Sequence, residues 1–225
     1  MNSRTERIIG KEKLNKILNS NIAVLGIGGV GGYVVEMLAR SGVSNLTIVD
    51  FDNIDISNLN RQIISLQSNI GQCKTTAFKN RILDINPNCK VSEKNVKINN
   101  DNIAEILNEK YDFVIDAIDD VNAKISIAKY CEQNNIKLIS SMGTGNRYKG
   151  TPCFEICDIS KTSYDKLAKK IRKLLKEENV KNLTVVYSKQ PCEQTDQLGS
   201  IVYYPLMCAG TIVSYVVNKI LDSKK

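Results

Sequence analysis

A glycine-rich loop near the start of the chain is the first feature that could bind a substrate. The sequence GIGGVGG at 26–32 follows a short apolar run and precedes a helical pattern that closes at Gly42. In a G-x-G-x-x-G loop, Gly26 permits the tight turn, Gly28 lets a phosphate approach the backbone, and Gly31 allows close helix–strand packing. The N-terminus of the following helix offers free N–H groups and a positive dipole to a phosphate. The loop therefore predicts a nucleotide site, although it does not identify the nucleotide.

An acidic residue ends the next strand-like run, NLTIVD at 45–50. This residue, Asp50, follows Gly28 at the distance where a carboxylate can hydrogen-bond a ribose in dinucleotide-binding folds. On these residues alone, an NAD-dependent dehydrogenase fits as well as any other nucleotide-binding protein.

The absence of histidine excludes several kinds of chemistry. Without histidine, one chain cannot form a Ser-His-Asp triad, a Cys-His pair or a metal site with imidazole ligands. Catalysis must depend on carboxylates, Lys and Arg, backbone amides, hydroxyls or thiols. This set of groups suits the chemistry of phosphates.

Seven cysteines are scattered along the chain, and none forms a C-x-x-C pair. Cys153 and Cys157 are spaced C-x₃-C without a second pair to complete a tetrahedral site, so we expect no zinc. Residues 1–16 lack the apolar core of a signal peptide. We therefore expect reduced thiols and a cytoplasmic location.

Strand-like and helical segments alternate along the first two thirds of the chain. The expected strands are 22–25, 45–50, 91–96, 112–116 and 137–141, and the expected helices lie around 34–39, at 71–86, after 101–102 and at 122–134. Alternation of this kind predicts an α/β fold with a Rossmann-like, doubly wound and mainly parallel sheet.

The last third departs from this alternation and adds further strands and helices. Additional strands are expected at 154–158 and 183–187, on either side of a basic helix at 164–178. The segment 201–221 is apolar enough to raise the question of a membrane span. Because it contains Pro205 and Lys219, a buried helix that begins near Pro205 is favoured, and we expect no membrane contact.

Five short motifs lie in order between residues 22 and 120: GIGGVG, DFD, SNLNRQ, GQCK and IDAID. In this order and spacing they resemble the ATP site of the ubiquitin-activating-enzyme-like superfamily of adenylating enzymes, which includes the ThiF and MoeB families. The resemblance implies an enzyme that uses ATP to adenylate a carboxylate and releases pyrophosphate. It also implies a nucleotide-binding set made of Gly26, Gly28, Gly29, Gly31, Asp50, Asp52, Asn58, Arg61 and Lys74.

The charged residues of these motifs suit such a reaction. ATP carries about four negative charges, and attack on its α-phosphate increases the charge on the leaving group. The planar guanidinium of Arg61 can bind a phosphate through two hydrogen bonds, and Lys74 can neutralise a phosphate as a point charge. Asn58 can hydrogen-bond phosphate or ribose, and Asp50 can hold the ribose. The resemblance implies that Asp119, expected at the carboxyl edge of the sheet, holds Mg²⁺.

The resemblance also implies a homodimer in which an arginine near the N-terminus reaches the ATP of the neighbouring subunit. Arg7 occupies that place, and Arg4 is a second candidate. An arginine supplied in trans contributes about 10³–10⁵ in rate in the best-studied phosphoryl-transfer case. The expected catalytic set is therefore Arg61, Lys74, Asp119 and Arg7. A carboxylate attacks already ionised, so the reaction needs no general base such as histidine.

Two subfamilies of adenylating enzymes compete. One activates the C-terminal glycine of a ubiquitin-like sulfur carrier in the thiamine or molybdopterin pathway, and its bacterial members usually carry two C-x-x-C zinc pairs, which this chain lacks. The other comprises the tRNA threonylcarbamoyladenosine dehydratases, which adenylate the carboxylate of a threonylcarbamoyl group in the anticodon loop before a ring closes. The basic helix, the VVYS strand at 185–188 and the apolar C-terminal helix resemble the dehydratases and favour tRNA as the partner.

The basic helix is the candidate surface for RNA. Eight basic and three acidic residues lie between 161 and 181, in a chain whose net charge is +7. Leu167, Ile171 and two further leucines form one helical face and leave the lysines outward. The tentative nucleic-acid-binding residues are Lys166, Lys169, Lys170 and Lys173.

The resemblance suggests a single ThiF-type domain over residues 1–225. Residues 1–20 form an N-terminal helical arm, 21–145 the nucleotide-binding core, and 146–225 the substrate and tRNA side with the C-terminal helix. A sulfur-carrier or cysteine-desulfurase-related partner is a further candidate. Cys192 lies in an expected loop beside Glu193, which disfavours a thiolate, so we assign it no catalytic role.

A non-catalytic nucleotide-binding scaffold is the alternative from another class. The presence of Arg61, Lys74 and Asp119 together argues against it, and failure to release pyrophosphate with any carboxylate would support it. A binding assay with ATP and NAD separates the dehydrogenase alternative.

Overall fold

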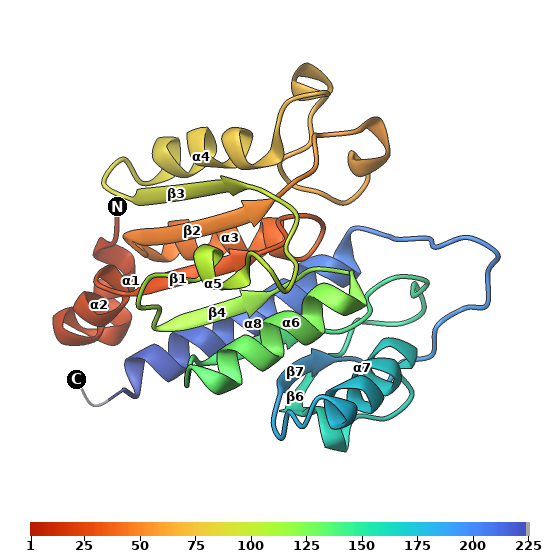
Figure 1. Cartoon of the computed structure of the whole chain (residues 1–225). Helices are drawn as coiled ribbons and strands as arrows, with labels where there is room; N and C mark the ends of the chain where they lie inside the picture. The colour runs from red at the N-terminus through yellow and green to blue at the C-terminus, as the bar shows by residue number, and fades with distance from the viewer. Residues whose placement is uncertain (224–225) are drawn as a thin grey trace.

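A seven-stranded sheet forms the centre of the computed structural model, which describes residues 1–223 (Figure 1). The strands are β1 (Asn21–Leu25), β2 (Asn45–Asp50), β3 (Lys90–Asn95), β4 (Phe113–Asp116), β5 (Leu138–Ser141), β6 (Glu155–Asp158) and β7 (Thr184–Tyr187). Their order is β3-β2-β1-β4-β5-β7-β6. All neighbouring pairs are parallel except β6 and β7, so β6 is an antiparallel edge strand. The expected α/β class and mainly parallel sheet are confirmed.

Helices cover both faces of the sheet (Figure 1). The helices of more than one turn are α1 (Ser3–Ile9), α2 (Lys11–Leu18), α3 (Gly31–Ser41), α4 (Lys74–Ile85), α6 (Val121–Gln133), α7 (Lys166–Glu177) and α8 (Tyr203–Leu221), and α5 (Ile103–Ile106) is a single turn. Helices α3, α4 and α8 enclose one apolar core against the sheet, and α5 and α6 enclose another on the opposite face. A third cluster joins α7 to β7 and to Ala128 of α6.

The helix boundaries follow from local backbone chemistry. Helix α3 ends at Gly42, whose φ of 95° is a left-handed conformation that glycine adopts freely. Helix α4 begins at Lys74 rather than at the expected residue 71, because Gly71 has a φ of 88°. Tyr164 likewise has a φ of 59°, so α7 begins only at Lys166, where the side chain of Asp165 caps it.

The chain changes direction across the sheet between β1 and β4. From β1 it proceeds outward to β2 and β3, and from β4 it proceeds in the opposite direction to β5 and β7. Strands β1 and β4 are paired, with Leu25 opposite Asp116 at their carboxyl ends. Ligands of open α/β sheets bind at such a switch point, outside the carboxyl ends of the strands.

Helix α8 is long and apolar enough to cross a membrane by length and composition. In the fold it packs against α3, and Cys208, Ile212 and Val216 are completely buried in the main core. The expectation of a core helix near Pro205 is therefore confirmed, with the helix starting two residues earlier, at Tyr203.

Candidate functional site

The glycine loop makes a turn too tight for side chains. Gly26 has a φ of 78°, and its amide donates to the carbonyl of Val49 at 2.8 Å. A Cβ on Gly31 would lie 1.8 Å from the carbonyl oxygen of Gly26, so no other residue fits there. A Cβ on Gly26 would lie 2.9 Å from Ile118, in the turn after β4. The loop thus lies between the ends of β1, β2 and β4.

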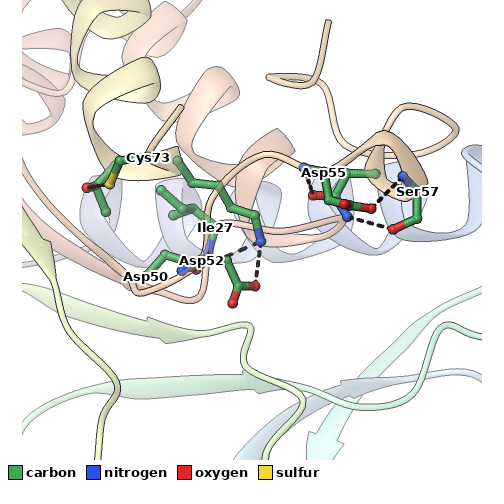
Figure 2. A network of polar contacts seen from close by, with 9 residues as sticks. Ile27, Asp50, Asp52, Asp55, Ser57 and Cys73 are labelled. Carbon is green, nitrogen blue, oxygen red and sulfur yellow. Dashed lines mark hydrogen bonds and ion pairs between the residues drawn. The ribbon is translucent and has the colours of Figure 1, made fainter. Parts of the chain in front are cut away.

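Asp50 holds the glycine loop in place (Figure 2). One carboxylate oxygen accepts from the amide of Ile27 at 2.9 Å, and the other accepts from the amide of Asp52 at 2.9 Å. The carboxylate therefore orders the turn on which a nucleotide would rest. This role is additional to the ribose contact expected from the sequence, because each oxygen retains a second lone pair.

Lys74 brings a buried positive charge to the same place. Its side chain is only 4% exposed, and its Nζ lies 2.7 Å from Asp52 Oδ2 and 3.9 Å from Asp50 Oδ1. The backbone amide of Lys74 donates to the carbonyl of Asp52 at 3.1 Å. As the first residue of α4, Lys74 also lies at the positive end of that helix.

The preceding residue carries a polarised thiol. Burial raises the pKa of the Cys73 thiol, but hydrogen bonds from the Thr75 side chain and the Thr76 and Thr75 amides outweigh this effect, so the pKa is below its ordinary value. The sulfur lies 3.1 Å from Thr75 Oγ1. By contrast, burial raises the pKa of the Cys208 thiol to about 12.

The SNLNRQ motif folds against the glycine loop. Asn58 is buried in a short 3₁₀ turn, and its Oδ1 accepts from the amide of Asp55 at 3.1 Å. Arg61 Nη1 donates to the carbonyl of Ser57 at 2.8 Å and to Asn60 Oδ1 at 2.9 Å. A Cβ on Gly29 would lie 3.7 Å from Arg61 Cγ, so the arginine adjoins the loop.

Asp119 is exposed in the turn after β4. Asp116 at the end of the strand fixes this turn, because its Oδ1 accepts from the amide of Ile118 at 3.1 Å. Asp116 is itself buried and forms an ion pair with Lys124 Nζ at 2.9 Å, while Ser140 Oγ donates to the same carboxylate at 2.6 Å. Removing one partner of a buried ion pair typically costs about 3–5 kcal/mol. The network therefore supports the segment that presents Asp119.

The structure brings most of the expected residues together at the switch point, but not all of them. Arg7 is exposed on α1, which lies beyond the amino ends of the strands, on the opposite side of the sheet from the glycine loop (Figure 1). A Cβ on Gly42, just before β2, would lie 2.6 Å from Asn2 Nδ2, which places α1 at that edge. The lysines expected to bind nucleic acid are exposed on α7, away from the core, and they are Lys166, Lys169, Lys170 and Lys173.

Two groups of buried polar residues near the site were not assigned individually from the sequence. Gln62 is buried, its Oε1 has no hydrogen-bond partner within residues 1–223, and its Nε2 would lie 3.6 Å from a Cβ on Gly28. Its place in SNLNRQ was the only signal. The pair Asp116 and Lys124 was also missed, although a lysine on the same helical face as Ala128 and Cys131 is unusual enough to indicate a buried charge.

The site combines a glycine loop, the carboxylate of Asp50 and the cationic side chains of Arg61 and Lys74 at the switch point of the sheet. This combination is typical of a Rossmann-like nucleotide-binding protein. The ThiF family matches residues 2–225. The tRNA threonylcarbamoyladenosine dehydratase of Bacillus subtilis is 44% identical over 187 residues, covering 83% of this chain and 73% of the relative. The molybdopterin-synthase adenylyltransferase of Haemophilus influenzae is 31% identical over 163 residues, covering 72% of this chain and 65% of the relative.

A solved structure shows the same likeness over nearly the whole chain. The crystal structure of E. coli tRNA N6-threonylcarbamoyladenosine dehydratase, TcdA, in complex with ATP matches with a TM-score of 0.92 and 32% identity. The match covers 97% of this chain and 92% of that chain. The protein therefore belongs to the ThiF family, and the resemblance inferred from the five motifs is confirmed.

Proposed function

We propose that this protein is an ATP-dependent tRNA threonylcarbamoyladenosine dehydratase. The observation that supports this most is the likeness over 97% of the chain to the E. coli dehydratase solved with ATP. The sequence relative from B. subtilis carries the same name. In the reaction, a carboxylate oxygen of the threonylcarbamoyl group bonds to the α-phosphorus of ATP, and the bond to pyrophosphate breaks. Intramolecular attack on the acyl-adenylate then closes the ring and releases AMP.

The nucleotide-binding residues act on this reaction through charge and position. The amides of the glycine loop and the N-terminus of α3 bind phosphate oxygens. Arg61 and Lys74 neutralise the charge that develops on pyrophosphate. Lys74 Nζ lies 2.7 Å from Asp52 Oδ2, so a phosphate that binds beside the lysine would compete with that carboxylate. Asn58 completes the binding set beside Gly26, Gly28, Gly29 and Gly31.

Mg²⁺ fits the carboxylates available at this site. Residues 1–223 contain no group of three or more metal-ligating side chains. Mg²⁺ is typically bound by one or two carboxylates together with substrate phosphates and waters, so it needs no such group. Asp119, exposed at the carboxyl edge beside the glycine loop, is the residue that would hold it. The ion would supply positive charge to the phosphates of ATP.

The proposal assigns the last third of the chain to tRNA. Residues 21–145 are the nucleotide-binding core of a single domain, and 146–225 are its substrate side. Lys166, Lys169 and Lys170 lie exposed with Lys173 on one side of α7 and can follow a phosphate backbone. A tRNA substrate is in keeping with a cytoplasmic location.

The proposal includes a homodimer. Helix α1, within the N-terminal arm 1–20, has no buried residues, and Ile8 beside Arg7 is 86% exposed. A groove of about 580 Å³ is lined mainly by apolar side chains of α3, β6 and α8, among them Tyr33, Met37 and Met207. We propose that a second copy covers these surfaces and that Arg7 then reaches the nucleotide site of the neighbouring subunit. Arg7 lies too far from the nucleotide site of its own subunit to act there (Figure 1).

Adenylation of a sulfur-carrier protein is the second candidate. The likeness to a molybdopterin-synthase adenylyltransferase supports it, but at lower identity and coverage. A sulfur-carrier or cysteine-desulfurase-related partner belongs to this candidate. The absence of C-x-x-C pairs disfavours it.

One experiment tests the proposal. The protein is incubated with Mg-ATP and tRNA from a strain that lacks this gene, and the nucleosides are analysed by mass spectrometry. We expect threonylcarbamoyladenosine to lose the mass of one water and AMP to form in equal amount. Unchanged nucleosides, with AMP formed only in the presence of a sulfur-carrier protein, would replace the proposal by the second candidate.

A further inference from the structure

Asn146 and Arg147, which follow β5, form hydrogen bonds with residues from distant parts of the chain. Arg147 is 3% exposed, and its Nη1 donates to the carbonyls of Ser188, at 3.0 Å, and Gln190. Its Nη2 donates to Asp165 Oδ2 at 3.1 Å. The arginine therefore fixes the start of the segment that follows β7.

Asn146 fixes the other end of the same segment. Its backbone N–H donates to the carbonyl of Gly199 at 2.8 Å, and its side-chain Oδ1 accepts from the backbone N–H of Gly199. Its carbonyl accepts from the amide of Glu193 at 2.7 Å. Residues 188–199, which we call the strap, are therefore attached at both ends to one two-residue turn.

The strap has little packing of its own. Residues 194–199 are exposed, and Leu198 is 82% exposed. A segment that buries so few apolar atoms is ordered mainly by its hydrogen bonds. The two residues that follow Arg147 are held from α8, since the hydroxyls of Tyr203 and Tyr204 donate to the carbonyls of Tyr148 and Lys149, both at 2.8 Å.

The strap is connected to both functional surfaces. At its end, the carbonyl of Ser200 accepts from Asn60 Nδ2 at 3.0 Å, and Asn60 Oδ1 accepts from Arg61. At its start, the Arg147 partner Asp165 caps α7 by accepting from the amide of Ala168 at 2.9 Å. Hydrogen bonds thus link the phosphate-binding arginine to the first turn of the basic helix.

From these contacts we propose that Asn146 and Arg147 are positioning residues that hold the strap between the ATP site and α7. The inference rests on the proposed function, because the strap then lies between the two substrates. A held strap aligns the carboxylate with ATP, and a misplacement of about 1 Å can reduce the rate by about 10²-fold. The glycine loop and Lys74 are held by Asp50 and Asp52, outside the strap, so we expect ATP binding to change little when the strap opens.

The test uses a substitution that the backbone tolerates. Asn146 has a φ of 56°, which glycine adopts freely, so Asn146→Gly removes only the side-chain acceptor. Asn146→Asp keeps an acceptor oxygen and should restore the parent behaviour. Asn135→Gly is the matched control, because Asn135 has a φ of 54° in the exposed turn after α6. Arg147 is left intact, since its loss would leave the buried carboxylate of Asp165 without its ion-pair partner.

Two readouts decide the inference. Thermolysin cleavage before Leu198, which precedes the Asn146 partner Gly199, measures opening of the strap without any substrate when the products are identified by mass spectrometry. Loss of one hydrogen bond predicts cleavage about three- to tenfold faster in Asn146→Gly than in the parent and both other variants. With modified tRNA, kcat should fall at least threefold in Asn146→Gly alone, while the Kd for ATP stays unchanged.

Each contrary result has one meaning. Equal cleavage before Leu198 in Asn146→Gly and the parent overturns the role of Asn146 in holding the strap. Faster cleavage with unchanged kcat overturns the positioning role. If the parent does not convert tRNA at all, the proposed function fails, and the cleavage rates still decide whether Asn146 holds the strap.

Discussion

Single residues in the nucleotide site are held by charges that ATP would displace. Lys74 is buried against Asp52 and Asp50, and both carboxylates would repel an approaching phosphate. If ATP binds beside Lys74, as we propose, the lysine is shared between the carboxylates and the phosphates, and a divalent cation reduces the remaining repulsion. On this proposal, a divalent cation held by the exposed carboxylate of Asp119 would offset the charge of the anionic substrate.

A substitution at Asp119 tests the site most directly. Asp119→Asn removes the charge and leaves the fold intact, because the side chain is exposed and Asp116 holds the turn. We expect AMP formation to fall by about 10²–10³-fold, the usual loss when one electrostatic contact to the transition state is removed. Steady-state AMP release with modified tRNA and the melting temperature are measured together.

The adjacent carboxylate provides the control. Asp120 caps α6 by accepting from the amide of Ala123 at 2.9 Å, and asparagine caps helices as well as aspartate does. Asp120→Asn should therefore keep both stability and activity. A folded Asp119→Asn protein with parental turnover would remove Asp119 from the site.

Secondary-structure elements were predictable where local sequence decides them. Strand β2 was expected at 45–50 and lies at Asn45–Asp50, because its apolar run is bounded by a turn and an aspartate. The starts of α4 and α7 were placed too early, since the positive φ at Gly71 and Tyr164 depends on the surrounding fold. The antiparallel direction of β6 has no local signal.

In the candidate site, too, some residues were predictable from local sequence and others were not. Asp50 could be placed from sequence because it ends a strand and strand ends meet at one edge of the sheet, whereas Lys74 was placed through the resemblance of the GQCK motif. The contacts of Asn146 and Arg147 could not be anticipated. Their partners lie between 18 and 53 residues away in the chain, so only the tertiary fold brings them together.

Helix α7 is the element on which the tRNA assignment depends. Its apolar side is buried through Ala168, Ile171 and Leu175, and its lysines are exposed. If they contact phosphates, replacing Lys169, Lys170 and Lys173 with Gln should weaken tRNA binding. The slope of log K against log salt should flatten by up to about two to three units, given about 0.7–0.9 per phosphate contact. Binding titrations over a series of salt concentrations measure this slope.

A second triple variant separates a local contact from net charge. Lys13, Lys90 and Lys110 are exposed on other elements, and their replacement with Gln removes the same total charge. This variant should retain nearly the parental slope, and ATP binding should be unchanged in both. Equal slopes in the two variants would remove α7 from the tRNA surface. Negligible tRNA affinity of the parent at low salt would favour the sulfur-carrier alternative.

The whole molecule presents surfaces that a monomer leaves uncovered. Helix α8 is apolar, but only 44% of its most apolar 18-residue stretch is buried inside the chain. Leu206 and Met207 on this helix remain 38% and 42% exposed beside the groove against α3. Apolar surfaces of this kind mark interaction sites in soluble proteins. Arg7 lies on another exposed element, beyond the amino ends of the strands and away from its own glycine loop (Figure 1), and the homodimer that we propose would account for both features.

Subunit exchange tests whether Arg7 acts on the neighbouring site. Arg7→Ala and Lys74→Ala should each be inactive as homodimers, because one lacks the arginine and the other lacks a phosphate-binding lysine. A mixed dimer has one site with both residues intact, since the Arg7→Ala subunit keeps Lys74 and receives Arg7 from its neighbour. Equal mixing should restore about a quarter of the parental AMP formation, because half of the dimers are mixed and each has one working site. Mixing Lys74→Ala with Asp119→Asn is the control, since each mixed dimer then carries a defect in both sites and should stay inactive. Absence of recovery in the first mixture, with exchange proved by differently tagged subunits, would show that Arg7 does not serve the neighbouring subunit.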